Sequence, residues 1–158
     1  MRNKVRISLS LVATLLLTAC GTQHPHINIP TISDIKKVTV GSGLPGSLLA
    51  VLTSTQEAHV LGMLQTAKDT GYHTPEIGGY PPFLTIQLSN GRFIYVIPST
   101  DTKKSGNSET GVPIKNYVDW YDSADQSDKP QRLYSPDLYA FLGDWKQTIP
   151  KLQWHQIG

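Results

Sequence analysis

Residues 83–97 read FLTIQLSNGRFIYVI, two apolar runs on either side of Asn90-Gly91. Asn-Gly is the preferred pair for a two-residue type I′ turn, and residues that alternate in polarity are typical of strands. The segment therefore predicts an antiparallel hairpin in which Ser89 pairs with Arg92.

The pairing assigns each side chain of this hairpin to one of its two faces. One face, which must pack on the core, carries Leu84, Ile86, Leu88, Phe93, Tyr95 and Ile97. The other face is mixed, and we expect a helix to cover part of it; it carries Thr85, Gln87, Ile94 and Val96.

The segment before this hairpin predicts two further strands and a helix. β-branched and apolar residues indicate strands at 35–40 and 47–53, joined by Gly41-Ser42-Gly43-Leu44-Pro45-Gly46. These six residues match G-x-G-x-x-G, but a dinucleotide site requires a helix to follow at once, whereas an apolar strand-like run follows here. We interpret them as a hairpin turn. Ser54 and Glu57 form a capping-box pattern that predicts the start of a helix, and Gly71 is expected to end it.

The segment after the hairpin predicts a long loop, a strand and a second helix. Residues 99–112 are polar and indicate an exposed loop, whereas 115–121 have strand-like composition. A second polar loop leads to a short strand at 132–134. Ser135-Pro136 then supplies an N-cap and a first-turn proline. An amphipathic helix follows, with apolar residues at helical spacing: Leu138, Phe141, Leu142 and Trp145.

These elements predict the fold class. A length of 158 residues allows one domain. Adjacent hairpins combined with two helices predict a single two-layer α+β domain over residues 34–158. We expect an antiparallel sheet of about five to six strands with both helices packed on one face.

The first twenty residues have the pattern of an export signal. Three basic residues precede an apolar stretch at 7–17, which is too short for a spanning helix. Leu17-Thr18-Ala19-Cys20 then resembles the lipobox of bacterial lipoproteins. The resemblance implies that residues 1–19 are cleaved, that Cys20 carries a diacylglyceryl group, and that the protein is held at the extracytoplasmic face of the cell membrane. Residues 20–33 would form the lipid anchor and a flexible tether.

Charge and cysteine content limit the classes of function. Without its leader the chain keeps eleven basic and twelve acidic residues, a balance that does not favour nucleic acid as a partner. Cys20 is the only cysteine. A lipid on its thiol therefore leaves no cysteine nucleophile and no disulfide. No motif for a cofactor is present, and we expect none.

An acidic run is the candidate metal-binding feature. Asp119, Asp122, Asp125 and Asp128 recur at every third residue, and calcium prefers several oxygen ligands. The run lacks the spacing, the central glycine and the final glutamate of an EF-hand, so a solvated acidic loop is the favoured interpretation and no metal is predicted.

The search for a catalytic site finds no recognised motif. The acids Glu57, Glu76 and Glu109 are available for a carboxylate pair of the glycoside-hydrolase kind, but no pattern favours one. Tyrosine and tryptophan are common in the second half of the chain, and both are favoured at binding surfaces. Tyr80 and Tyr121, which lie beside loops, are the candidate binding residues, whereas Trp120 and Trp145 are expected in the core.

The combination of lipobox, tether, small α+β domain and the late Ser-Pro-x-Leu-Tyr helix start resembles small uncharacterised lipoproteins of Gram-positive bacteria. The resemblance implies no catalytic residues. The first functional hypothesis is a non-catalytic module that binds a protein or an envelope component. The second is a small lipoprotein that binds a ligand or calcium through residues 119–128, and the third is an envelope hydrolase.

Overall fold

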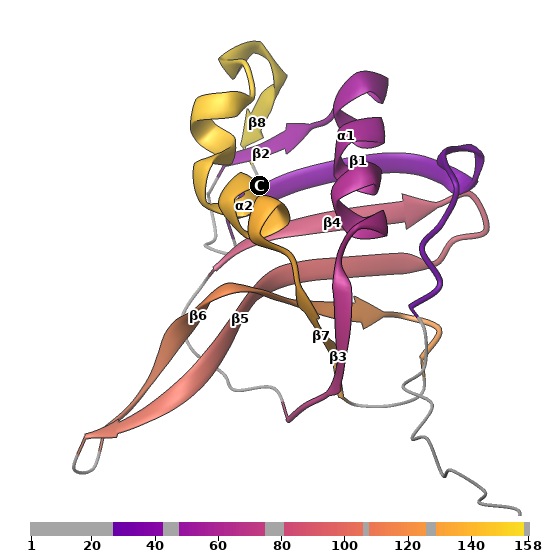
Figure 1. The fold of residues 1–158 in the computed structure, drawn as a ribbon. Coiled ribbons are helices and arrows are strands. Elements are labelled where there is room, and N and C mark those ends of the chain that lie inside the picture. The colour runs from indigo at the N-terminus through magenta and orange to yellow at the C-terminus, as the bar shows by residue number, and fades with distance from the viewer. Residues whose placement is uncertain (1–26, 43–47, 75–80, 106–107, 126–128, 157–158) are drawn as a thin grey trace, which may run out of the picture.

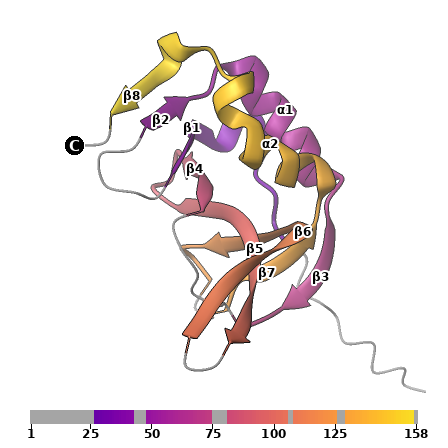
Figure 2. The same ribbon diagram turned by 90° about the vertical axis from the view of Figure 1, so that its left-hand side faces the viewer.

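The fold is α+β, with one antiparallel sheet and two helices, as predicted (Figure 1). The computed structural model describes residues 27–42, 48–74, 81–105, 108–125 and 129–156. Its strands and helices are β1(Ile35–Ser42), β2(Leu48–Val51), α1(Ser54–Gln65), β3(Lys68–Tyr72), β4(Pro82–Leu88), β5(Phe93–Ser105), β6(Ser108–Asp122), β7(Gln131–Tyr134), α2(Pro136–Thr148) and β8(Trp154–Gln156). Both helices pack on the same face of the sheet (Figure 2).

In the described part of the chain the sheet has eight strands, in the order β3-β7-β6-β5-β4-β1-β2-β8, so the prediction of five to six strands was too low. The two strands that the prediction omitted, β3 and β8, are the two edges of the sheet. β3 pairs with β7, and β8 pairs with β2. Both are short and lack apolar alternation, because an edge strand depends on pairing with a distant neighbour rather than on a pattern of its own.

The β4–β5 hairpin forms, but its predicted register was wrong by one residue. Leu88 donates its N–H to Arg92 O over 2.9 Å, so three residues rather than two make the turn. Gly91 has a φ of +88°, as expected for the left-handed residue of a three-residue loop. Leu84 therefore pairs with Val96, and Ile86 pairs with Ile94.

The shift of one residue exchanges the two faces of β5. Ile94 and Val96 are fully buried in the core under the helices, whereas Tyr95, expected in the core, is 42% exposed. The predicted division of β4 was correct, since its inward residues Leu84, Ile86 and Leu88 are buried.

The described residues of the range 99–112 do not form a loop, contrary to the prediction. β5 and β6 continue as a two-stranded ribbon from the Thr100–Pro113 pair to the Ser105–Ser108 pair, and this ribbon projects from the body of the domain (Figure 1). A ribbon without a sheet or helix packed on it does not need apolar alternation, which explains why its polar sequence indicated a loop.

The boundaries of α1 also differ from the prediction. Thr53, not Ser54, is the N-cap, and the capping box pairs Thr53 with Gln56; the backbone N–H of Thr53 donates to Gln56 Oε1 over 2.8 Å. Glu57 instead accepts a hydrogen bond from the N–H of Val38 over 3.2 Å. The helix ends at Gln65, and Gly71 lies in β3 with a φ of +97°, at a register irregularity against β7.

The second helix is positioned as predicted. Pro136 begins α2 and Ser135 is its N-cap, although the Ser135 side chain makes no capping hydrogen bond. Leu138, Leu142 and Trp145 point into the core. Trp120 is 3% exposed and also belongs to the core, as expected.

The expected tether is in part packed on the domain. Ile27 and Ile29 contact the hydrophobic core, and Ile32–Asp34 form a 3-10 turn capped by Thr31. The described part of the chain therefore joins the domain before residue 34. The leader, Cys20, the first part of the tether and most of the Gly41–Gly46 turn lie outside the described residues, but β1 and β2 pair as the expected hairpin.

Candidate functional site

The described members of the acidic run have separate partners. Asp119 is 2% exposed and lies in a buried polar cluster. Asp122 pairs with Arg92, and Asp125 accepts a hydrogen bond from the Tyr72 hydroxyl over 3.1 Å. Asp128 lies outside the described residues. The structure thus does not bring these three carboxylates around one point, and the residues it describes contain no group of three or more metal-ligating side chains.

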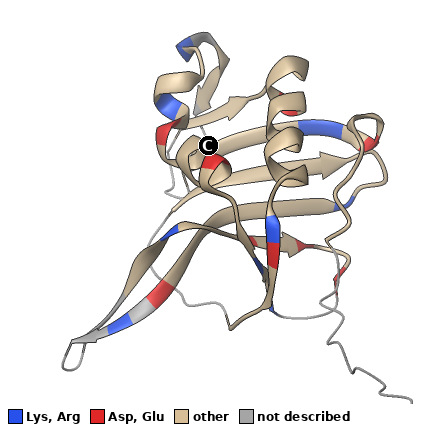
Figure 3. Cartoon of the chain, viewed as in Figure 1, with Lys and Arg blue, Asp and Glu red and all other residues tan. Residues whose placement is uncertain are grey.

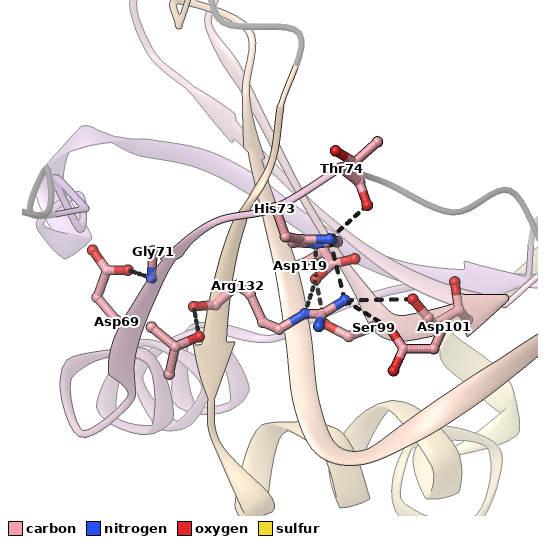
Figure 4. Close-up of polar contacts among 10 residues, drawn as sticks. Asp69, Gly71, His73, Thr74, Ser99, Asp101, Asp119 and Arg132 are labelled. Atoms are coloured by element: carbon pink, nitrogen blue, oxygen red, sulfur yellow. Dashed lines mark hydrogen bonds and ion pairs between the residues drawn. The ribbon is translucent and has the colours of Figure 1, made fainter.

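Three side chains converge on the carboxylate of Asp119 (Figure 4). The hydroxyl of Ser99 donates a short hydrogen bond to Oδ1. His73 Nε2 lies 2.7 Å from the same oxygen, although its N–H is not aligned with it, and Arg132 Nε lies 3.7 Å away. We call these four residues the Asp119 cluster.

Pairing of distant strands assembles the Asp119 cluster. Asp119 on β6 lies directly opposite Arg132 on β7. Ser99 lies on β5 at a register irregularity between Pro98 and Thr100, which turns its side chain toward β6. His73 follows β3, the edge strand that pairs with β7. The backbone N–H of His73 donates to Pro130 O over 3.2 Å. The cluster therefore joins β5, β6, β7 and the residue that follows β3.

Arg132 connects the cluster to its surroundings. Its Nη2 lies 3.1 Å from His73 Nδ1, 3.4 Å from Thr100 O and 3.6 Å from Asp101 Oδ1. His73 Nδ1 also lies 2.8 Å from Thr74 O. A buried carboxylate is stable only when charge and hydrogen bonds compensate its lost hydration, and these contacts supply both.

The geometry of the Asp119 cluster differs from that of a catalytic triad. In a triad the histidine lies between the serine and the aspartate, so that it can accept the serine proton. Here Asp119 lies between Ser99 and His73, and Ser99 uses its proton on the carboxylate. This arrangement holds strands together and does not activate the serine.

Tyr121 borders the cluster on β6. Burial, and in second place the charge of Asp119, raises the pKa of Tyr121 to about 12. Because the folded state holds this proton more tightly than the unfolded state does, the free energy of unfolding should fall as the pH rises from about 10 to about 12.

We expect a spectroscopic titration of the folded chain to show this difference. Part of the phenolate absorbance should appear in a late step near pH 12. Tyr121→Phe should remove the late step. A late step that survives Tyr121→Phe would contradict the assignment.

An aromatic strip lies on the sheet face away from the helices, formed by Phe93, Tyr95 and Tyr121. Tyr95 and Tyr121 are directly paired across β5 and β6. Phe93 stacks on Tyr95 with ring centroids 6.4 Å apart. Tyr95 is 42% exposed. The sequence predicts Tyr121 as a binding residue but places Phe93 and Tyr95 in the core, because the face on which they lie depends on the hairpin register.

The remaining candidates are dispersed. Tyr80 and Glu76 lie outside the described residues, and nothing is described of the Glu109 side chain. Basic and acidic residues are scattered over the described elements (Figure 3). Among the described residues, the helices include none that is long and apolar enough to cross a bilayer.

Comparisons of this chain with protein-family models, with curated proteins and with solved structures found no match.

Proposed function

We propose that this protein is a lipid-anchored extracytoplasmic module that binds a protein or another envelope component and has no catalytic role. The observation that carries the proposal is the aromatic strip. Its three rings lie side by side on the uncovered face of the sheet, and Tyr95 is the most exposed of them. Aromatic side chains supply a large apolar contact area at low entropic cost, which favours them at interfaces.

The rigidity of the strip supports this role. Each strip residue alternates along its strand with a core residue: Ile94 and Val96 on β5 and Trp120 on β6 are buried. The rings are therefore presented by a backbone that the core holds in place, so binding orders few additional groups.

The two alternative functions, a ligand- or calcium-binding lipoprotein and an envelope hydrolase, have less support from the described residues than the binding module has. The described acids of the 119–128 run are separated by their own partners, and the order of contacts in the Asp119 cluster does not activate Ser99. The anchoring part of the proposal depends on the leader and on the lipobox Leu17-Thr18-Ala19-Cys20.

Site-specific photo-crosslinking in living host cells tests the binding role. A benzoylphenylalanine at position 95 should give adducts of defined mass, because it keeps an aromatic ring in the strip. The matched control carries benzoylphenylalanine in place of Gln147, an exposed residue of α2 on the helix-covered side of the sheet. Tyr121→Ser should reduce the adducts formed from position 95. Equal adducts from both positions, or none from position 95, would count against the proposal.

The anchor is tested separately. The intact mass of the native protein should match a chain that begins at Cys20 and carries acyl groups. Cys20→Ser should abolish the acylation and the release of the leader. A native product with an unmodified cysteine would overturn the anchor but not the binding role of the strip.

A further inference from the structure

An open groove separates the two helices on the side of the domain opposite the aromatic strip. It has a volume of about 460 Å³. On each helix most of the lining residues are three or four positions apart in the sequence, so each helix lines the groove with one face. The groove is lined among others by His59, Met63, Asp137, Phe141, Asp144 and Ile149.

The floor of the groove is apolar. Met63 and Ile149 are nearly buried, and Phe141 is half-buried between the helices. A groove of this volume falls within the range of about 300–1,000 Å³ that is typical of small-ligand sites. Its floor favours a ligand with a hydrocarbon body.

The walls of the groove carry two carboxylates on the same face of α2. Asp137 and Asp144 are exposed, and neither side chain pairs with any residue in the described part of the chain. Asp137 lies in the first turn of α2, where a negative charge complements the helix dipole. Asp144 lies in the second half of α2, where a negative charge does not complement the helix dipole.

We propose that this groove binds an aliphatic diamine, a ligand with an ammonium group at each end of a hydrocarbon chain. Asp137 and Asp144 are seven residues apart, which corresponds to about 10.5 Å along a helix axis. One ammonium group pairs with each carboxylate, and the methylene groups between them pack on Met63 and Phe141. His59 lines the same groove from α1, and an imidazole nitrogen can accept a hydrogen bond from an ammonium group. This site is independent of the proposed binding role of the aromatic strip.

Calorimetric titration of the purified full chain in a neutral detergent tests the proposal. The probe is diaminooctane, because its extended length matches the spacing of the two carboxylates. Diaminobutane is too short to reach both, and octylamine has only one ammonium group. Octylamine should bind about fivefold more weakly, which is the effect of losing one exposed ion pair of about 1 kcal/mol. Diaminobutane should bind at least as weakly, because it also loses methylene contacts. Equal affinities for diaminooctane and octylamine, or no binding of diaminooctane, would overturn the proposal.

Matched variants separate the site from general charge attraction. Asp144→Asn should weaken diaminooctane binding about fivefold, to the affinity of octylamine. Gln65→Lys changes the net charge by the same amount at an exposed position at the end of α1 that does not line the groove, and it should change the affinity less than about twofold. Both positions are exposed, so far-UV circular dichroism should show an unchanged fold. Equal losses in the two variants would show that the attraction is not specific to the groove.

Discussion

Asp119→Asn is expected to lower the free energy of unfolding by about 3–5 kcal/mol, the usual cost of removing one partner from a buried ion pair. The Asp119 side chain is 3% exposed. It accepts a hydrogen bond from Ser99 and lies within ion-pair distance of His73 and Arg132. The substitution keeps the shape of the side chain but removes its charge. Arg132, which is 20% exposed, would then have lost its buried counterion.

Urea unfolding followed by tryptophan fluorescence measures this effect, because Trp120 and Trp145 are buried. The matched control is Asp101→Asn. Asp101 also lies near Arg132, at 3.6 Å, but it is 67% exposed. Solvent screens such a pair, so its loss should cost less than about 1 kcal/mol. Similar losses of unfolding free energy in both variants would show that the buried charge of Asp119 contributes no more to stability than the exposed charge of Asp101.

The second large effect is expected at Ile94. Ile94→Ala should lower the free energy of unfolding by about 2–5 kcal/mol, because the side chain is fully buried and its removal leaves a cavity. Tyr95→Ser, at the neighbouring residue, should cost about 1 kcal/mol or less, since Tyr95 is 42% exposed and loses mainly its contacts with Phe93 and Tyr121.

These two variants also test the hairpin register. A two-residue turn at Asn90-Gly91 would place Tyr95 in the core and Ile94 outside, and would reverse the order of the two losses. The three-residue turn predicts a large loss at Ile94 and a small loss at Tyr95. The comparison therefore tests whether the aromatic strip exists as a surface.

The hairpin shows how far local sequence rules extend. Alternation located both strands, and Asn90-Gly91 located the turn. Turns of two and three residues are both compatible with a glycine at position 91, and they place the same side chains on opposite faces. Both faces of β5 carry apolar residues, so the pattern could not decide which of them packs under the helices.

The Asp119 cluster shows the other limit. His73, Ser99 and Arg132 are separated from Asp119 by 46, 20 and 13 positions, and the sequence contains no pattern that connects them. Their meeting depends on the pairing of β3 with β7 and on the irregularity in β5. The sequence indicated only that Asp119 belonged to an acidic run, and the neighbours in that run proved to have other partners.

The sequence by itself determined the α+β class, the two helices and the central strands, because burial of one face imposes a local period that can be recognised in a single segment. The tertiary structure alone decided the two edge strands, the extension of the β5–β6 ribbon, the face of β5 that carries the aromatic strip, and the Asp119 cluster. Each of these depends on which distant segments pair and in what register. Those choices are made by the packing of the whole core and leave no period in any one segment.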